Sequence, residues 1–202
     1  MKNQPSPPSD LLTNETFVDT MNELMTLLAR ACNVPSALVM RVHEREIEVF
    51  AASQTPGSPY QVGDKEHLDM GLYCESVMEG RMELLVPNAL KDALWCNNPD
   101  IRLGMIAYFG CPLYWPDGRV FGTICVLDSK DNAFGESVRQ IVRVGQRLME
   151  DRLRLVAALE EKEKLHAALV TTRNDLAKAL KIAVDQVGVG VAADARGTED
   201  DR

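Results

Sequence analysis

Residues 106–128, IAYFGCPLYWPDGRVFGTICVLD, constrain the fold of this chain more than any other stretch. Apolar, aromatic and β-branched residues fill Ile106–Trp115 and Val120–Leu127, and the Pro-Asp-Gly sequence at 116–118 suits a tight turn that ends on a left-handed glycine. The stretch therefore predicts a β-hairpin. Because both alternating faces of each strand are apolar, each face must be covered, as in the central pair of a sheet packed between helices or loops.

The segment before this hairpin predicts a helix, a second hairpin and a long loop. Residues 13 and 14 offer capping side chains for a helix whose apolar residues recur at steps of three and four and which Pro35 ends. Two strands with a polar turn follow within residues 37–52. Residues 54–70 are rich in proline and glycine, which predicts an irregular loop that either covers a binding site or only connects two elements.

Smaller elements are expected between this loop and the core hairpin. Residues 71–80 have a helical pattern and residues 83–86 can add a short strand. Residues 87–100 are turn-rich, with Asn and Asp side chains that can cap helix starts, and Leu94 and Trp95 would anchor them to the core. The prediction is an α+β fold, with a central antiparallel β-sheet between helices and a loop-covered pocket.

The hairpin residues YFGCPLYWPDGRVFGTICVLD, together with LYCESV and VPNALKDALWCNNPD upstream, resemble the core of GAF domains, which are small-molecule-sensing modules of bacterial signalling proteins. The resemblance covers residues 13–150 and implies a sensory domain with residues 87–100 as a lid over its pocket. It is greatest to GAF modules that precede diguanylate cyclase or histidine kinase domains. Because this family binds many ligands or none, the resemblance implies signalling without naming the signal.

The C-terminal part of the chain predicts a long helix from Phe134 to about Val187, followed by a disordered tail at 188–202. A heptad pattern makes residues 151–187 a coiled-coil signalling helix, although charged residues at several a positions weaken its seam. The alternative is a helix that bends back at Thr171 and Thr172 over its own domain. A homodimer is the expected partner state, with the seam residues Leu148, Leu155, Leu159, Leu169, Leu176 and Leu180 at its interface.

Composition excludes several classes of partner. The chain has 22 Lys and Arg against 30 Asp and Glu, a net charge of -8, and no basic run that could follow a phosphate backbone. No nucleic-acid partner is therefore expected. No membrane partner is expected either, since no segment approaches the ~20 apolar residues that cross a bilayer. We expect a cytoplasmic protein with a Pro- and Ser-rich disordered segment at residues 1–12.

Catalytic and metal chemistry have little support in the sequence. The three histidines, His43, His67 and His166, do not stand at metal-ligand or catalytic-triad spacing from a cysteine or carboxylate, and no phosphate-binding glycine loop is present. Among the ligands of the resembled family, cyclic nucleotides and covalent bilins are disfavoured, because their Asn-Lys and Cys-His patterns are missing. No metal is expected, and the cofactor is unknown.

The five cysteines, none of them in a CxxC pair, are expected to be reduced. If the hairpin turn has three residues, Cys111 pairs with Thr123 and Cys125 is only its diagonal neighbour, too far for a disulfide. A two-residue turn would put the two cysteines on opposite faces, and only a further register slip would place them opposite each other. Both therefore are interpreted as small buried apolar residues. By the resemblance, Cys74 lies beside the pocket and Cys96 in the lid, so redox sensing is conceivable, although neither has a neighbouring base in the sequence.

A pocket with apolar walls and a few polar tips is the default binding site for such a domain. The predicted lining residues are Tyr73, Cys74, Trp95, Tyr108 and Cys111, each of which can equally be part of the core. The favoured function is a non-enzymatic sensory module that binds an unidentified small molecule and relays the signal through a dimeric C-terminal helix to a separate or missing effector. The alternatives are a cysteine-dependent reductase of free methionine sulfoxide or a thiol-based redox sensor, and a ligand-free dimerisation scaffold.

Overall fold

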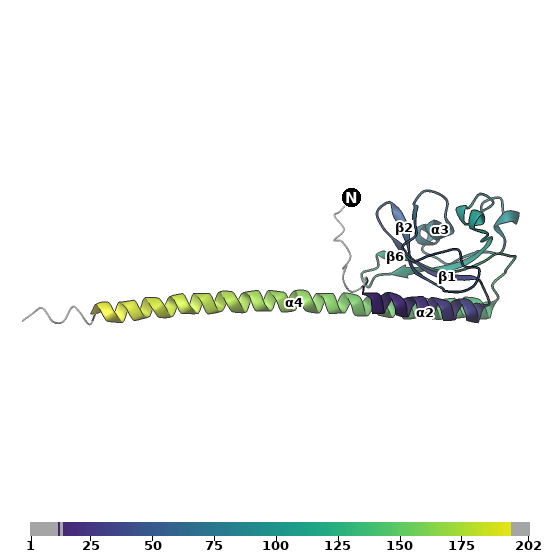
Figure 1. Cartoon of the computed structure of the whole chain (residues 1–202). Coiled ribbons are helices and arrows are strands. Elements are labelled where there is room, and N and C mark those ends of the chain that lie inside the picture. The colour runs from purple at the N-terminus through teal and green to yellow at the C-terminus, as the bar shows by residue number, and fades with distance from the viewer. Residues whose placement is uncertain (1–11, 13, 195–202) are drawn as a thin grey trace, which may run out of the picture. The chain divides into compact units, whose positions relative to one another are not determined.

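The computed structural model of the chain describes residue 12 and residues 14–194, with side chains to residue 184. Residues 1–157 and 158–202 form two separate units, a globular one and one whose described part is helical (Figure 1). The predicted disorder at residues 1–12 lies outside the described residues, except at Leu12. The same is true of residues 195–202 of the predicted tail. No helix in the described part of the chain is long and apolar enough to cross a bilayer.

One six-stranded antiparallel sheet organises the globular unit, with the strand order β3-β2-β1-β6-β5-β4. The predicted core hairpin is β5–β6, and each of its strands has a neighbour on both sides. Its position inside the sheet is thus confirmed, as is the second hairpin, β1–β2. The strands are β1 (Ser36–Val42), β2 (Glu46–Ala52), β3 (Lys65–His67), β4 (Leu84–Val86), β5 (Ala107–Tyr114) and β6 (Val120–Asp128).

Helices form where the capping residues indicated. The Asn14 side chain accepts a hydrogen bond from the Thr16 backbone N–H at 3.0 Å, and Asn33 in the left-handed conformation ends the first described helix. Asn88 and Asn98 cap the two short 3-10 helices of the turn-rich segment in the same way. The helices are α2 (Glu15–Cys32), α3 (Tyr73–Gly80), η1 (Ala89–Lys91), η2 (Pro99–Leu103) and α4 (Glu136–Asp194).

The two faces of the sheet bury separate apolar clusters, as the two-sided apolar pattern predicted. On one face, α2 and the beginning of α4 cover alternate strand residues such as Val39, Phe109 and Ile124. A side chain at Gly145 of α4 would lie 3.0 Å from Ile124 and 3.8 Å from Leu28 of α2, so this glycine lets α4 pack closely on both. The other face, under α3 and the 3-10 helices, carries the candidate site.

A β-bulge near the hairpin turn changes the predicted register. The Trp115 backbone N–H donates to the Arg119 carbonyl, as expected for a three-residue turn, but the pairing shifts by one residue between Leu113 and Tyr114. Cys111 therefore pairs with Ile124 rather than with Thr123, and it lies on the opposite face of the sheet from Cys125. The diagonal-neighbour prediction was wrong, because a bulge reverses the facing of every residue beyond it. Both cysteines are free and buried, as predicted.

Two predictions for the loops also need correction. The segment 54–70 is not wholly irregular, because Lys65–His67 form the edge strand β3 against β2. Trp95 is buried as expected, whereas Leu94 is 78% exposed and does not anchor the turn-rich segment. Residues 93–97 form a turn between the two 3-10 helices. Successive side chains of this turn point in different directions, so only one of the two apolar residues reaches the core.

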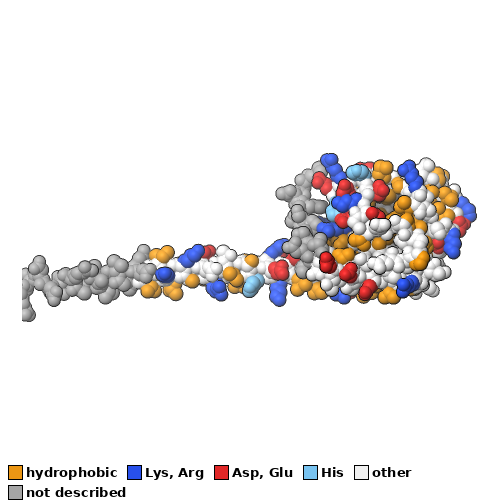
Figure 2. Space-filling model, in the orientation of Figure 1, with side chains coloured by type: hydrophobic (Ala, Val, Ile, Leu, Met, Phe, Trp, Pro, Cys, Tyr) orange, Lys and Arg blue, Asp and Glu red, His pale blue; other side chains and the backbone are white. Residues whose placement is uncertain are grey.

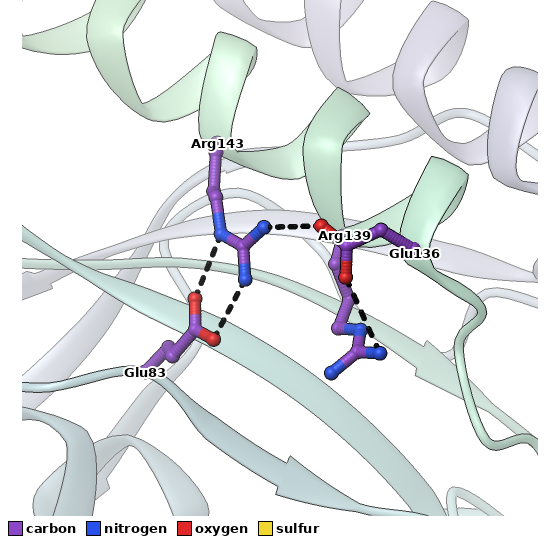
Figure 3. Close-up of polar contacts among 4 residues, drawn as sticks. All are labelled: Glu83, Glu136, Arg139 and Arg143. Atoms are coloured by element: carbon purple, nitrogen blue, oxygen red, sulfur yellow. Dashed lines mark hydrogen bonds and ion pairs between the residues drawn. The ribbon is translucent and has the colours of Figure 1, made fainter.

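The beginning of α4 is tied to the segment between α3 and β4 by a group of ion pairs (Figure 3). Arg143 donates from Nε and Nη2 to the two carboxylate oxygens of Glu83, at 2.9 and 2.8 Å, and from Nη1 to Glu136 at 2.8 Å. Arg139 pairs with the other oxygen of Glu136 at 3.3 Å. A bidentate pair of this kind fixes the relative orientation of the guanidinium and the carboxylate as well as their distance. The position of Glu83 along α4 is therefore defined.

The second unit consists, in its described part, of the remainder of α4. The helix passes Thr171 and Thr172 without a break, with both hydroxyls donating to carbonyls one turn earlier, and it continues to Asp194. It therefore has no bend at the threonine pair, and it extends past Val187, where disorder was expected to begin. Hydrophobic side chains alternate with charged ones along this part (Figure 2).

Candidate ligand-binding site

A cavity of about 450 Å³ lies on the face of the sheet that α3 covers. Its floor is apolar, because alternate residues of four strands point to this side. That size is within the range of small-molecule sites. The floor residues are Leu38 and Met40 of β1, Ile47 and Val49 of β2, Tyr108 of β5, and Cys125 and Leu127 of β6.

The rim of the cavity comes from two segments that hydrogen bonds hold together. The Tyr60 hydroxyl donates to Oδ1 of Asp100 at 2.8 Å, which joins the long loop after β2 to η2. The Asn98 side chain donates to the Gly71 carbonyl at 2.8 Å and accepts from the Asp100 backbone N–H at 3.0 Å. Asn98 thus both starts η2 and fixes it to the start of α3, so that the position of Asp100 is set from two sides.

Asp100 is the most perturbed carboxyl group at this site. Burial raises its pKa from the ordinary 3.8 to about 6, and the charge of Glu66 adds to this rise, whereas the hydrogen bond from Tyr60 opposes it. The carboxyl group is therefore mostly ionised at neutral pH but easily protonated below it. Perturbed groups of this kind in a cavity are typical of functional sites.

Four polar side chains meet where α3 crosses the sheet. The Cys74 sulfur lies 3.5 Å from the Tyr108 hydroxyl and accepts a hydrogen bond from Thr123 Oγ1 at 3.3 Å. Hydrogen bonds from Cys125, Thr123 and Tyr108 lower the pKa of the Cys74 thiol, although its burial acts in the opposite direction. The bond that Cys125 gives to Cys74, together with burial, raises the pKa of Cys125. Of the two thiols, Cys74 is therefore the more acidic.

An aromatic stack lies behind Cys74. The Tyr73 ring packs on Tyr108 with centroids 4.8 Å apart and on Trp95 with centroids 5.2 Å apart. All three side chains are buried, and the Tyr73 hydroxyl has no hydrogen-bond partner among the described residues. Gly110 makes room for this arrangement, because a side chain there would meet the Tyr108 hydroxyl at 2.1 Å.

The five predicted pocket residues fall into three groups. Cys74 and Tyr108 line the cavity. Tyr73 and Trp95 belong to the same apolar cluster but pack behind the lining. Cys111 is a correction: the bulge in the hairpin puts it on the opposite face of the sheet, under α4, away from the cavity.

Sequence reasoning missed the polar rim, and in particular Tyr60 and Asp100. The Asn-Pro-Asp sequence at 98–100 indicated a capped turn, which the structure contains as η2. Nothing in the local sequence pairs Asp100 with Tyr60, because the two lie on segments distant in the chain. The pairing of Cys74 with Cys125 was missed for the same reason, while Cys96, the other cysteine considered for redox sensing, is exposed in the turn-rich segment.

The fold and the sequence agree on one family. The GAF domain family model matches residues 17–149 of the chain. The chain belongs to the GAF domain family. Its core hairpin, α3 and lid segment all lie within the matched range, so the sequence resemblance is confirmed over almost its full predicted extent.

This GAF domain also matches a curated protein and many solved structures. It is 26% identical over 85 residues to the diguanylate cyclase DgcP of Escherichia coli strain K12, a match that spans 42% of this chain but only 24% of DgcP. The PixJ GAF domain of Thermosynechococcus elongatus superposes with a TM-score of 0.58 at 17% identity, over 73% of this chain and 91% of that one.

A free methionine-R-sulfoxide reductase has the same fold. The enzyme from Neisseria meningitidis, solved with its substrate, superposes with a TM-score of 0.58 at 14% identity, over 73% of this chain and 84% of that one. At such identities the two solved structures establish the GAF fold and leave the ligand of this GAF domain open.

Proposed function

We propose that this GAF domain is a sensory module whose cavity binds a small molecule and whose α4 helices transmit the binding event within a dimer. The cavity of about 450 Å³, with an apolar floor and a polar rim, is the observation that carries the proposal. Sites for small molecules have this composition, since apolar walls supply affinity and a few polar groups supply orientation.

A physical route from the cavity to α4 supports the relay. The start of α3 contributes Leu72 and Cys74 to the cavity, and Glu83, in the segment that follows α3, binds Arg143 of α4 through two hydrogen bonds. A ligand that changes the position of α3 therefore acts on α4 through Glu83. It can shift the helix only as far as its affinities for the two arrangements differ.

The leucine seam of α4 is the proposed dimer interface. All six of its leucines are exposed within the single chain, from 39% for Leu159 to 69% for Leu169. A row of exposed leucines at heptad spacing is stabilised when a second helix covers it.

Lysines placed on this seam should weaken the dimer. With Leu169→Lys and Leu176→Lys together, we expect the dimer dissociation constant to rise at least about tenfold, because each dimer must then bury four charged groups. Sedimentation equilibrium measures the change. Thr171→Lys with Asn174→Lys adds the same charge outside the seam and should leave the dimer intact. An unaffected dimer in the seam variant would assign the interface to another surface.

Native mass spectrometry on the protein purified from cells tests the proposed function as a whole. We expect a dimer that carries additional small-molecule mass. A dimer without added mass, in a chain that also binds none of the probes described below, would favour the ligand-free scaffold. A monomer would remove the proposed route of transmission.

The thiol pair favours a second candidate, a cysteine-dependent reductase or thiol-based redox sensor. Cys74 has a lowered pKa, lines the cavity and has Cys125 as its neighbour, so a sulfoxide bound there would meet a nucleophilic thiolate and a second thiol. A methionine-R-sulfoxide reductase is among the proteins with this fold. Turnover of methionine sulfoxide with dithiothreitol, lost in both Cys74→Ser and Cys125→Ser, would establish this function. No turnover by the wild type would remove the reductase.

The output of the sensor is proposed to be a cyclic-dinucleotide or phosphorylation signal. The matched part of Escherichia coli DgcP belongs to a diguanylate cyclase. By analogy, α4 would act on a cyclase or kinase domain, on the same chain or a separate one.

A further inference from the structure

We propose that the ligand of the cavity is a small organic cation, a protonated amine on an apolar body, whose charge pairs with Asp100. This inference rests on the proposed function, because it names the chemistry of the molecule that the cavity binds.

The Asp100 carboxylate has no counter-ion in the protein. Among the described residues, no Lys, Arg or His nitrogen lies within 4.0 Å of its oxygens, and its side chain accepts one hydrogen bond, from Tyr60 to Oδ1. An ionised carboxylate that is partly removed from water costs free energy unless a cation or several donors compensate it. Because Asp100 lines the cavity, a bound cation is the partner that fits its position.

The other charged residues of the lining leave the interior negative. Lys65 donates to Glu46 at 3.2 Å, so its charge is matched by a residue that does not line the cavity. Arg102 is exposed at the rim, where water screens it. Glu66 and Asp64 add two further carboxylates to the rim. The basic side chains of the lining therefore do not offset the charge of Asp100.

The electrostatic influence of Asp100 extends across the site. Burial is the main reason why the pKa values of Tyr60, Tyr73 and Tyr108 are raised, and the charge of Asp100 adds to each rise. The pKa of Cys125 is raised mainly by its contact with Cys74 and by burial, and Asp100 adds to this rise too. A negative charge that makes neighbouring groups harder to ionise also attracts a positive ligand. Asp100 raises the pKa of groups on the strands, on α3 and in the loop alike.

The walls of the cavity suit an organic cation better than a metal ion. The rings of Tyr60 and Tyr108 line it, and aromatic faces attract ammonium groups. Leu38, Met40 and Val49 form an apolar floor that would bury the body of the ligand. Metal ions such as Ca²⁺ instead require six to eight oxygen ligands around them, which an apolar floor does not supply.

Three probes of similar size test the inference on the 202-residue chain. Phenethylamine is a cation at neutral pH, phenethyl alcohol is neutral and hydrocinnamate is an anion. Isothermal titration calorimetry with the wild type, Asp100→Asn and Asp117→Asn compares them. Asp100→Asn keeps the size of the side chain and an acceptor for Tyr60, while Asp117, exposed at the hairpin turn, is the matched control.

We expect the amine to bind the wild type most tightly and hydrocinnamate least. Asp100→Asn should weaken amine binding at least about tenfold, since a charge-assisted contact is lost, and should leave the alcohol unchanged. Asp117→Asn should bind all three as the wild type does. Circular dichroism and thermal unfolding confirm that each variant is folded.

The outcomes separate this inference from the proposed function. The cation inference is overturned if the alcohol or hydrocinnamate binds as tightly as the amine or more tightly. It is also overturned if Asp100→Asn does not change the affinity for the amine. In both cases the cavity remains a binding site. If no probe binds, the composition of any co-purified molecule decides: a basic nitrogen supports the inference and its absence overturns it. If no probe binds and no small molecule co-purifies with the protein, both the inference and the proposed function fail.

Discussion

Gly122→Ala should destabilise the domain by about 3 kcal/mol or more, the largest effect expected of any single methyl group in this chain. Gly122 lies in β6 at the bulge, between Arg41 of β1 and Leu113 of β5. A Cβ at this position would lie 1.8 Å from the Met40 carbonyl oxygen and 2.7 Å from its carbon, and both are backbone atoms. Strands β1 and β6 would have to separate, which breaks the sheet at its centre. Urea unfolding measures the loss.

Gly80→Ala is the matched control for this prediction. Gly80 ends α3, and a Cβ there would contact only the flexible side chain of Met82, at 3.4 Å. Both substitutions remove the same freedom from the unfolded chain. We expect Gly80→Ala to change stability by about 0.5 kcal/mol or less. A loss below about 1 kcal/mol for Gly122→Ala would show that the bulge accommodates a side chain and contradict the argument.

Asp100→Asn should stabilise the unliganded protein by about 2 kcal/mol at pH 8, an effect that disappears in acid. The pKa of Asp100 is raised from 3.8 to about 6 in the folded state, so folding is opposed by its charge above pH 6. As the pH falls from about 6 to about 4, the folded wild type takes up the proton and the cost vanishes. The advantage of the variant should therefore be full above pH 6 and absent below about pH 4. Urea unfolding of both proteins across this range checks the prediction.

Asp117→Asn provides a control of opposite sign. Hydrogen bonds from the backbone and side chain of Arg119 lower the pKa of Asp117, so its charge favours the folded state above its unfolded pKa. The variant should be slightly less stable at neutral pH, and this difference should also be lost in acid. If Asp100→Asn were destabilising at pH 8, Asp100 would be a structural carboxylate and the cavity would not carry an uncompensated charge.

The two expected effects of Asp100→Asn, weaker amine binding and greater stability, describe one trade-off. A group that costs stability in the free protein and gains affinity in the complex is typical of binding sites. The added stability and the lost amine binding should therefore appear in the same variant.

The extent to which sequence predicted the site depended on the range of the interactions. Cys74 and Tyr108 were predicted as pocket residues, Cys74 because of the family resemblance, and both line the cavity. Asp100 and Tyr60 were missed, since each looks like an ordinary polar loop residue until the folded chain brings the two together. Cys111 was misplaced by a single-residue bulge, which sequence alternation alone does not reveal.

The sequence by itself determined the order and type of nearly all elements: capped helices, apolar hairpins and a heptad helix follow from local propensity and periodicity, which act over a few residues. Only the tertiary structure decided the strand register at the bulge, the meeting of Cys74 with Cys125, and the position of Asp100 against Tyr60. Those outcomes depend on close packing and on the burial of charge between distant segments, and both exist only once the chain has folded.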